Sequence, residues 1–189
     1  TANNKTEVDE FSTSVLAGRK DLQSKLADQE IQIVHTNKNK SIWIAETIDK
    51  DYLKAGGTDQ NALPRHAYLI TSGYWKPIIR ETLNVECLVD GFEQATKSIV
   101  VQTNWNCQNS IYLYDLSDGT QITFSDPRGL VPKDKPWILG GGIMKGVIPS
   151  DLGFGLLEVS YAGPNPYATA YFNADDGKLL NLVLFENFT

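Results

Sequence analysis

The feature that most restricts the fold is the Asp-Gly pair at 118–119, which separates two short runs of alternating residues at 111–115 and 121–124. Asp-Gly is favoured in type I′ turns, which need positive φ at both central positions and join antiparallel strands. The pair therefore predicts a β-hairpin, and with it an antiparallel sheet.

Other parts of the chain show the same two-residue period. Apolar and polar residues alternate in further strands predicted at 31–33, 42–44, 68–71, 83–89, 98–103 and 167–172. A last predicted strand, 179–185, is almost continuously apolar. Such a run favours a strand that is covered on both faces.

The N-terminal segment has a helical period instead. A single apolar stripe recurs there at three-, four- and seven-residue steps: Val8, Phe11, Val15, Leu22 and Leu26. We predict a helix over about 7–28 that packs this stripe on the sheet, after a flexible N-terminus at 1–6.

The fold class that follows is mainly β (α+β), with an N-terminal amphipathic helix packed on an antiparallel sheet, in a sandwich or partly open barrel built from hairpins. The 189 residues fit a single domain, predicted over 7–189. Turn glycines recur at intervals of about 30 residues, but their flanking residues do not match. Because the chain is also too short for a closed ring of ~40-residue blades, we do not predict a propeller.

Charge and hydropathy exclude several classes of partner. With 17 basic and 23 acidic residues the net charge is −6, which disfavours nucleic acid and anionic lipid as partners. No window reaches the ~18 apolar residues needed to cross a bilayer, so we predict no membrane-spanning segment in this chain. We predict no cofactor and no metal, since His35 and His66 lack the spacing of a metal site.

Two cysteines, Cys87 and Cys107, form an even pair whose spacing allows a disulfide bridge. A bridge indicates an extracytoplasmic protein, because reducing compartments do not preserve it. The polar start of the chain, without Met, also fits a secreted, periplasmic or surface form trimmed of a leader. The alternative is two reduced, buried thiols.

The best candidate for a binding surface is rich in aromatic and amide side chains. Its residues are Tyr74, Trp75, Asn104, Trp105 and Asn106. Aromatic faces stack on the apolar face of a sugar ring, and planar amides pair with its hydroxyls. The alternative is that Trp105 anchors the core at a strand end while the amides form turns.

Catalytic motifs are missing from the sequence. No nucleophile elbow or family cysteine signature accompanies His35 or His66. We therefore predict a noncatalytic protein that works through contact with another protein, as a subunit, an inhibitor or an immunity-type partner. A carbohydrate-binding module or lectin is one alternative. A hydrolase whose site is assembled in space, with a histidine beside a carboxylate or hydroxyl, is the other.

Overall fold

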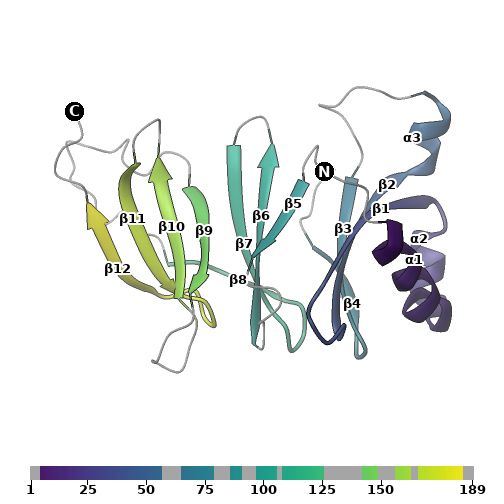
Figure 1. Cartoon of the computed structure of the whole chain (residues 1–189), viewed down its shortest axis with the longest axis horizontal. Coiled ribbons are helices and arrows are strands. Elements are labelled where there is room, and N and C mark those ends of the chain that lie inside the picture. Colours follow the sequence, from purple (N-terminus) through teal and green to yellow (C-terminus); the bar gives the residue numbers. More distant parts are fainter. Residues whose placement is uncertain are drawn as a thin grey trace. The chain divides into compact units, whose positions relative to one another are not determined.

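The computed structural model of the chain describes residues 5–56, 65–78, 86–90, 97–105, 108–125, 142–148, 156–162 and 166–184. The described strands form three four-stranded antiparallel sheets (Figure 1). Two α-helices precede the strands, and a third, α3 (Lys50–Lys54), lies between the second and third strands. The protein is therefore mainly β, with a helical N-terminus and sheets built from hairpins, as predicted.

The three sheets follow one another along the chain, and each adds its strands in chain order. Sheet 1 contains β1 (Gln29–Thr36), β2 (Ile42–Asp49), β3 (Arg65–Thr71) and β4 (Trp75–Ile78). Sheet 2 contains β5 (Glu86–Asp90), β6 (Ser98–Trp105), β7 (Gln108–Asp115) and β8 (Gln121–Ile122). Sheet 3 contains β9 (Gly142–Ile148), β10 (Leu156–Ala162), β11 (Pro166–Asn173) and β12 (Leu179–Leu184).

The same four-stranded meander thus occurs three times. Four antiparallel strands in chain order also make up one blade of a propeller. The sequence comparison of the turns missed this repeat, because the repeat lies in strand order and most residues around the turns differ.

The chain divides into two compact units, unit 1 (Thr1–Cys87) and unit 2 (Leu88–Thr189). Sheet 1 belongs to unit 1, whereas sheet 3 and most of sheet 2 belong to unit 2. The single domain over 7–189 stays a prediction.

The predicted helix at about 7–28 is divided in the structure. Helix α1 (Lys5–Ser14) is followed by a 3₁₀ turn, η1 (Leu16–Gly18), and by helix α2 (Lys20–Leu26). Arg19 between them has φ −126° and ψ 92°, which is extended backbone. Gly18 lowers helix propensity at this point. Of the N-terminus predicted to be flexible, Lys5 and Thr6 belong to α1, and residues 1–4 lie outside the described residues.

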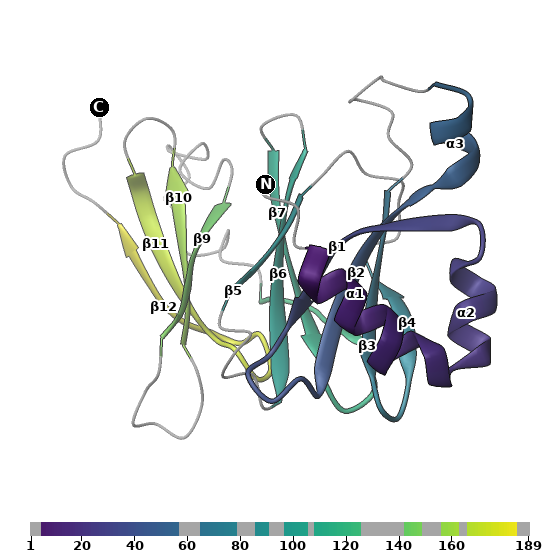
Figure 2. The ribbon, with the colours of Figure 1, turned by 45° about the vertical axis from the view of Figure 1, so that its right-hand side comes forward.

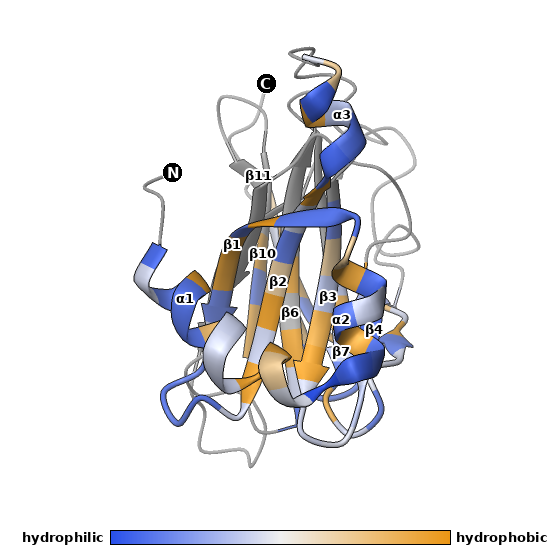
Figure 3. Ribbon diagram, turned by 90° about the vertical axis from the view of Figure 1, so that its right-hand side faces the viewer, coloured by the Kyte–Doolittle hydropathy of each residue, from blue (hydrophilic) through white to orange (hydrophobic). Residues whose placement is uncertain are grey.

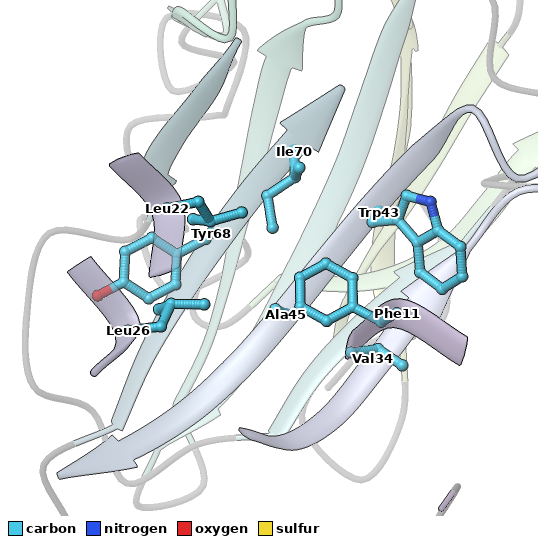
Figure 4. Close-up of a cluster of buried hydrophobic side chains, with 8 residues drawn as sticks. All are labelled: Phe11, Leu22, Leu26, Val34, Trp43, Ala45, Tyr68 and Ile70. Atoms are coloured by element: carbon cyan, nitrogen blue, oxygen red, sulfur yellow. The ribbon is translucent and has the colours of Figure 1, made fainter. Parts of the chain in front are cut away.

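Despite the break, the apolar stripe still faces one surface. Figure 2 shows α1 and α2 on the same side of sheet 1, and Figure 3 shows apolar stretches of β2 and β3 beneath them. The buried cluster between helices and sheet, drawn in Figure 4, consists of Phe11, Leu22, Leu26, Val34, Trp43, Ala45, Tyr68 and Ile70. Burial of this stripe, rather than propensity, holds such short helices in place.

In unit 2, sheets 2 and 3 share a second apolar cluster. It joins Leu113 of β7 to residues of sheet 3 and of the turn that follows β11, namely Leu157, Val159, Ala170, Phe172 and Ala174. Phe124 adds an edge-on ring contact with Phe172, with centroids 5.1 Å apart. The two sheets of unit 2 therefore pack on one another.

The predicted hairpin at Asp118-Gly119 is present, but its turn is not type I′. Gly119 has φ 74°, whereas the only non-glycine residue with positive φ among those described is Lys40. The turn instead spans four residues, closed by a 2.8 Å hydrogen bond from Asp115 N–H to Thr120 O. Asp118 Oδ1 accepts from Thr120 N–H at 2.9 Å, so the carboxylate stabilises the turn locally.

A second turn, between β11 and β12, has the same kind of side-chain hydrogen bonds and a glycine with positive φ. Asn173 Oδ1 accepts from Asp175 N–H at 2.8 Å, and Asp176 Oδ1 accepts from Lys178 N–H at 2.9 Å. Gly177 closes the turn with φ 74°. This likeness supports the repeat seen in the strand order.

The prediction that the last strand is covered on both faces is wrong. β12 is the end strand of sheet 3, paired with β11, and its Leu180 and Val183 are 45% and 39% exposed. Leu179 and Leu182 do pack on the cluster of unit 2. The apolar run therefore has one covered face, and its other face is open in the part of the chain that the structure describes.

Candidate functional site

Both histidines lie beside carboxylates. His35 on β1 is opposite Ile44 on β2, and its Nε2 lies 2.8 Å from Oε2 of Glu46. His66 on β3 has its Nε2 3.0 Å from Oδ1 of Asp49. The antiparallel register of sheet 1 thus assembles two histidine–carboxylate pairs that no sequence spacing indicated.

The two pairs differ in burial. The Glu46 side chain is only 5% exposed, whereas the side chains of His66 and Asp49 are 33% and 42% exposed. A buried carboxylate is unfavourable unless hydrogen-bonded. His35 therefore has a structural task, which is to satisfy Glu46.

A histidine oriented by a carboxylate is two-thirds of a catalytic triad, and the missing third is a hydroxyl or thiol nucleophile. Among the described residues, the side-chain partners of His35 and His66 are these carboxylates. Glu46 and Asp49 are an odd number of positions apart on one strand, so the pairs point to opposite faces of sheet 1. The two pairs cannot combine into one site.

The His66 pair lies near a small polar network on the helix-covered face. Gln29 Oε1 accepts from Tyr68 Oη at 2.9 Å and from Thr47 Oγ1 at 2.5 Å. Burial raises the pKa of the Tyr68 phenol, and the charge of Asp49 adds to this rise. The phenol therefore stays protonated and continues to donate to Gln29.

Of the predicted sugar-binding residues, Trp75 and Tyr74 are described in full. Trp75 Nε1–H donates to Asp21 Oδ2 at 2.6 Å, and its ring meets Tyr68 edge-on with centroids 6.2 Å apart. Tyr74 O accepts from Thr71 N–H at 2.8 Å in the turn between β3 and β4. Trp75 therefore links α2 to the sheet, while Tyr74 helps to form a turn.

The hydrogen bond between Trp75 and Asp21 makes the folding stability of the protein depend on pH. The indole hydrogen bond lowers the pKa of Asp21 below its usual 3.8, and the Leu22 N–H and the Arg19 charge act in the same direction. A lowered folded-state pKa stabilises the fold above the unfolded-state value, and this contribution is lost as the pH falls through the lowered pKa.

We therefore expect Asp21→Asn to reduce the loss of thermal stability between about pH 6 and about pH 3. Melting temperatures across this range test the expectation. Asp51→Asn, which removes another exposed carboxylate from a first helical turn, in α3 (Lys50–Lys54), is the control. An unchanged pH profile in Asp21→Asn would contradict the role of the indole contact.

The remaining predicted site residues are only partly described. Asn104 and Trp105 end β6 and pair through the backbone with Asn109 and Gln108 of β7. Asn106 and Cys107 lie outside the described residues, as do the side chains of Asn104, Trp105 and Cys87. The sugar-binding surface at 104–106 and the Cys87–Cys107 bridge therefore stay predictions.

The free side of β12 is a second candidate site, which the sequence analysis missed. No other described strand pairs with it, and residues 179–184 contain neither a charge nor a proline. Edge strands are usually protected by charges, prolines or bulges. The bulge opposite Phe172 protects only the start of β12, so the segment from Asn181 to Leu184 is a regular edge that no described strand covers.

The described residues give no sign of a metal site or of a membrane-spanning helix. The described residues contain no group of three histidine, cysteine or acidic side chains placed to hold a metal ion. None of the described helices has the length and apolar character needed to cross a membrane. Comparison of the sequence with known protein families and with curated proteins finds no match.

Proposed function

We propose that the protein is a noncatalytic, extracytoplasmic subunit that works through protein contact, and that the free edge of β12 is the contact surface. The occupant of this edge is a β12 strand from a second copy of the chain. The observation that supports the proposal is an uncharged, apolar strand lying at the end of a sheet, where Leu180 and Val183 stay exposed.

Strand addition at an edge satisfies backbone N–H and C=O groups that otherwise bond only to water. Antiparallel pairing centred on Leu182 places this residue opposite its counterpart in the second copy. Val183 then faces Asn181 of the other strand. Because the segment has no charge, the pairing brings no like charges together.

The net charge of −6 makes the proposed dimerisation depend on salt concentration. Two copies repel one another through their net charge, and salt screens this repulsion. Strand pairing between apolar segments is therefore expected to strengthen as ionic strength rises, whereas association through ion pairs would weaken.

Val183→Lys tests the proposal. A lysine on the edge adds a charge that the pairing must desolvate, so we expect the dissociation constant of the dimer to rise about tenfold or more, which equals ~1.4 kcal/mol. Sedimentation equilibrium over a range of concentrations and salt measures this change.

Leu53→Lys is the matched control, since Leu53 on α3 is 38% exposed, almost the same as Val183. The control is expected to dimerise like the wild type. A wild type that stays monomeric at all concentrations would refute the second copy as the occupant, and equal weakening by both variants would refute β12 as the surface.

A further inference from the structure

Unit 1 contains a cavity of about 330 Å³ at one end of sheet 1. It lies where the end of α1 and the turn η1 meet the β1–β2 and β3–β4 turns. Ser14 and Gly18 line it from the helical side, and Ser41 and Ser72 line it from the two turns. The volume is at the lower end of the range found for small-molecule sites.

Part of the cavity lining is apolar. Val15, Trp43 and Ile70 line it, and the last two belong to the buried cluster between helices and sheet. Trp43 is fixed by a 3.1 Å hydrogen bond from its Nε1–H to Lys40 O. The cavity lining thus combines apolar side chains, one of them fixed by a hydrogen bond, with serine residues.

Two cations line the same cavity, Arg19 and Lys40. Arg19 Nη1–H donates to Thr71 O, which ties the guanidinium to the last residue of β3. This is the one side-chain hydrogen bond that Arg19 makes within the described part of the chain. A guanidinium has five N–H donors, so it keeps donors for a ligand.

Lys40 is held by a 2.5 Å ion pair from its Nζ to Glu10 Oε1. The carboxylate near Arg19 is Asp21, which accepts from Trp75. Neither Glu10 nor Asp21 is among the residues that line the cavity. The cavity lining therefore includes two cationic side chains and no acidic one, and the Lys40 ammonium keeps N–H donors beyond the one that it gives to Glu10.

We propose that this cavity binds a small organic carboxylate with a compact apolar part. The carboxylate accepts hydrogen bonds from the Arg19 guanidinium and the Lys40 ammonium, and the apolar part rests on Trp43 and Ile70. Arginine favours planar anions such as carboxylates, because its parallel N–H groups bind both oxygens. The proposal does not depend on β12.

Hexanoate is the probe, with hexanol, hexylamine and inorganic phosphate as comparison ligands. The indole N–H of Trp43 reports binding in two-dimensional NMR titrations, because Trp43 lines the cavity and this N–H donates to Lys40 O. A ligand of this size should bind with a dissociation constant on the order of 1 mM. Hexanol and phosphate, which each lack one of the two features, should bind at least about fivefold more weakly, and hexylamine should not bind.

Two variants test separately the contribution of the Lys40 charge and that of the open volume of the cavity. Lys40→Gln removes one cation and should weaken hexanoate about fivefold. Gly18 lines the cavity, and a Cβ there meets no atom within 4 Å, so Gly18→Leu adds an apolar side chain to the cavity wall without a clash of its Cβ and should abolish binding. Lys38→Gln and Gly73→Leu are matched controls: Lys38 is an exposed lysine of the same turn, and a Cβ at Gly73 also meets open space.

Binding that is about fivefold weaker in Lys40→Gln and lost in Gly18→Leu, with wild-type affinity in the controls, would support the proposal. Equal binding of hexylamine and hexanoate would overturn the charge argument. Undiminished hexanoate affinity in Gly18→Leu would show that the ligand binds elsewhere, and the absence of any shift at Trp43 would overturn the site itself.

Discussion

Replacement of Phe11 by alanine is expected to lower the free energy of unfolding of unit 1 by about 3–5 kcal/mol, the largest effect that we predict for a single substitution. Phe11 is completely buried, and it is the one buried residue of α1. Its ring packs on Trp43 with centroids 5.7 Å apart (Figure 4). Its removal takes away both the buried area and the contact that fixes α1.

The consequence for α1 follows from its length. Ten residues are too few for a helix to be stable in water by itself, so α1 depends on this contact. We expect its amides to lose protection from hydrogen exchange in Phe11→Ala, while amides of sheet 3 keep theirs. Urea denaturation gives the change in free energy.

Phe11→Leu and Leu53→Ala serve as controls for this result. Leucine keeps much of the buried volume and should be far less destabilising than alanine. Leu53 is partly exposed, so its truncation should change stability by less than about 0.5 kcal/mol. A loss below about 1 kcal/mol in Phe11→Ala would contradict the anchoring role of Phe11.

The local part of the fold could be predicted from the sequence. Alternation of apolar and polar residues, with a glycine at each turn, located the hairpins around Gly119 and Gly177, because both signals act over a few residues. The helical stripe through Phe11 and Leu22 was equally visible. Such patterns depend on which way side chains point, and this is fixed by local backbone geometry.

Strand neighbours could not be predicted in the same way. An apolar run such as 179–184 has the same pattern in the middle of a sheet and at its edge, since the difference lies in what pairs with it. That pairing is non-local. For this reason the sequence indicated a covered strand, and the structure has an edge strand.

The candidate sites depended on the same non-local contacts. His35 meets Glu46 only because the β1–β2 register, with its bulge between Ile31 and Ile33, brings the two strands together. Arg19 reaches Thr71 across 52 positions in the sequence. Neither pairing follows a spacing rule, so no motif search could have found the histidine pairs or the cavity.

Gly177→Ala is the second substitution with a large expected effect, a loss of about 3 kcal/mol from unit 2. Two separate penalties add in this variant. Gly177 has φ 74°, where a side chain costs about 1 kcal/mol. A Cβ there would also lie 2.9 Å from the carbonyl oxygen of Thr123, which is backbone and cannot rotate away. Overpacking of this kind costs about 1–3 kcal/mol more.

Gly56→Ala separates the two penalties. Gly56 has φ 73°, almost the same conformation, but a Cβ there meets no atom within 4 Å. In Gly56→Ala the free energy of unfolding of unit 1 should therefore fall by only about 1 kcal/mol, which urea denaturation of the whole chain measures. The excess loss in Gly177→Ala then measures how closely the β11–β12 turn approaches the segment after β8. Equal losses in the two variants would contradict that approach.

The same variant tests how the two sheets of unit 2 are joined. Ser125 N–H donates to Gly177 O at 3.0 Å, next to the point where the new Cβ would meet Thr123. To accommodate the methyl group, the turn must move away from Thr123, and this hydrogen bond must lengthen. The Ser125 amide should therefore exchange with solvent faster in Gly177→Ala, whereas the Asp115 amide, bonded within its own turn, should keep its wild-type rate.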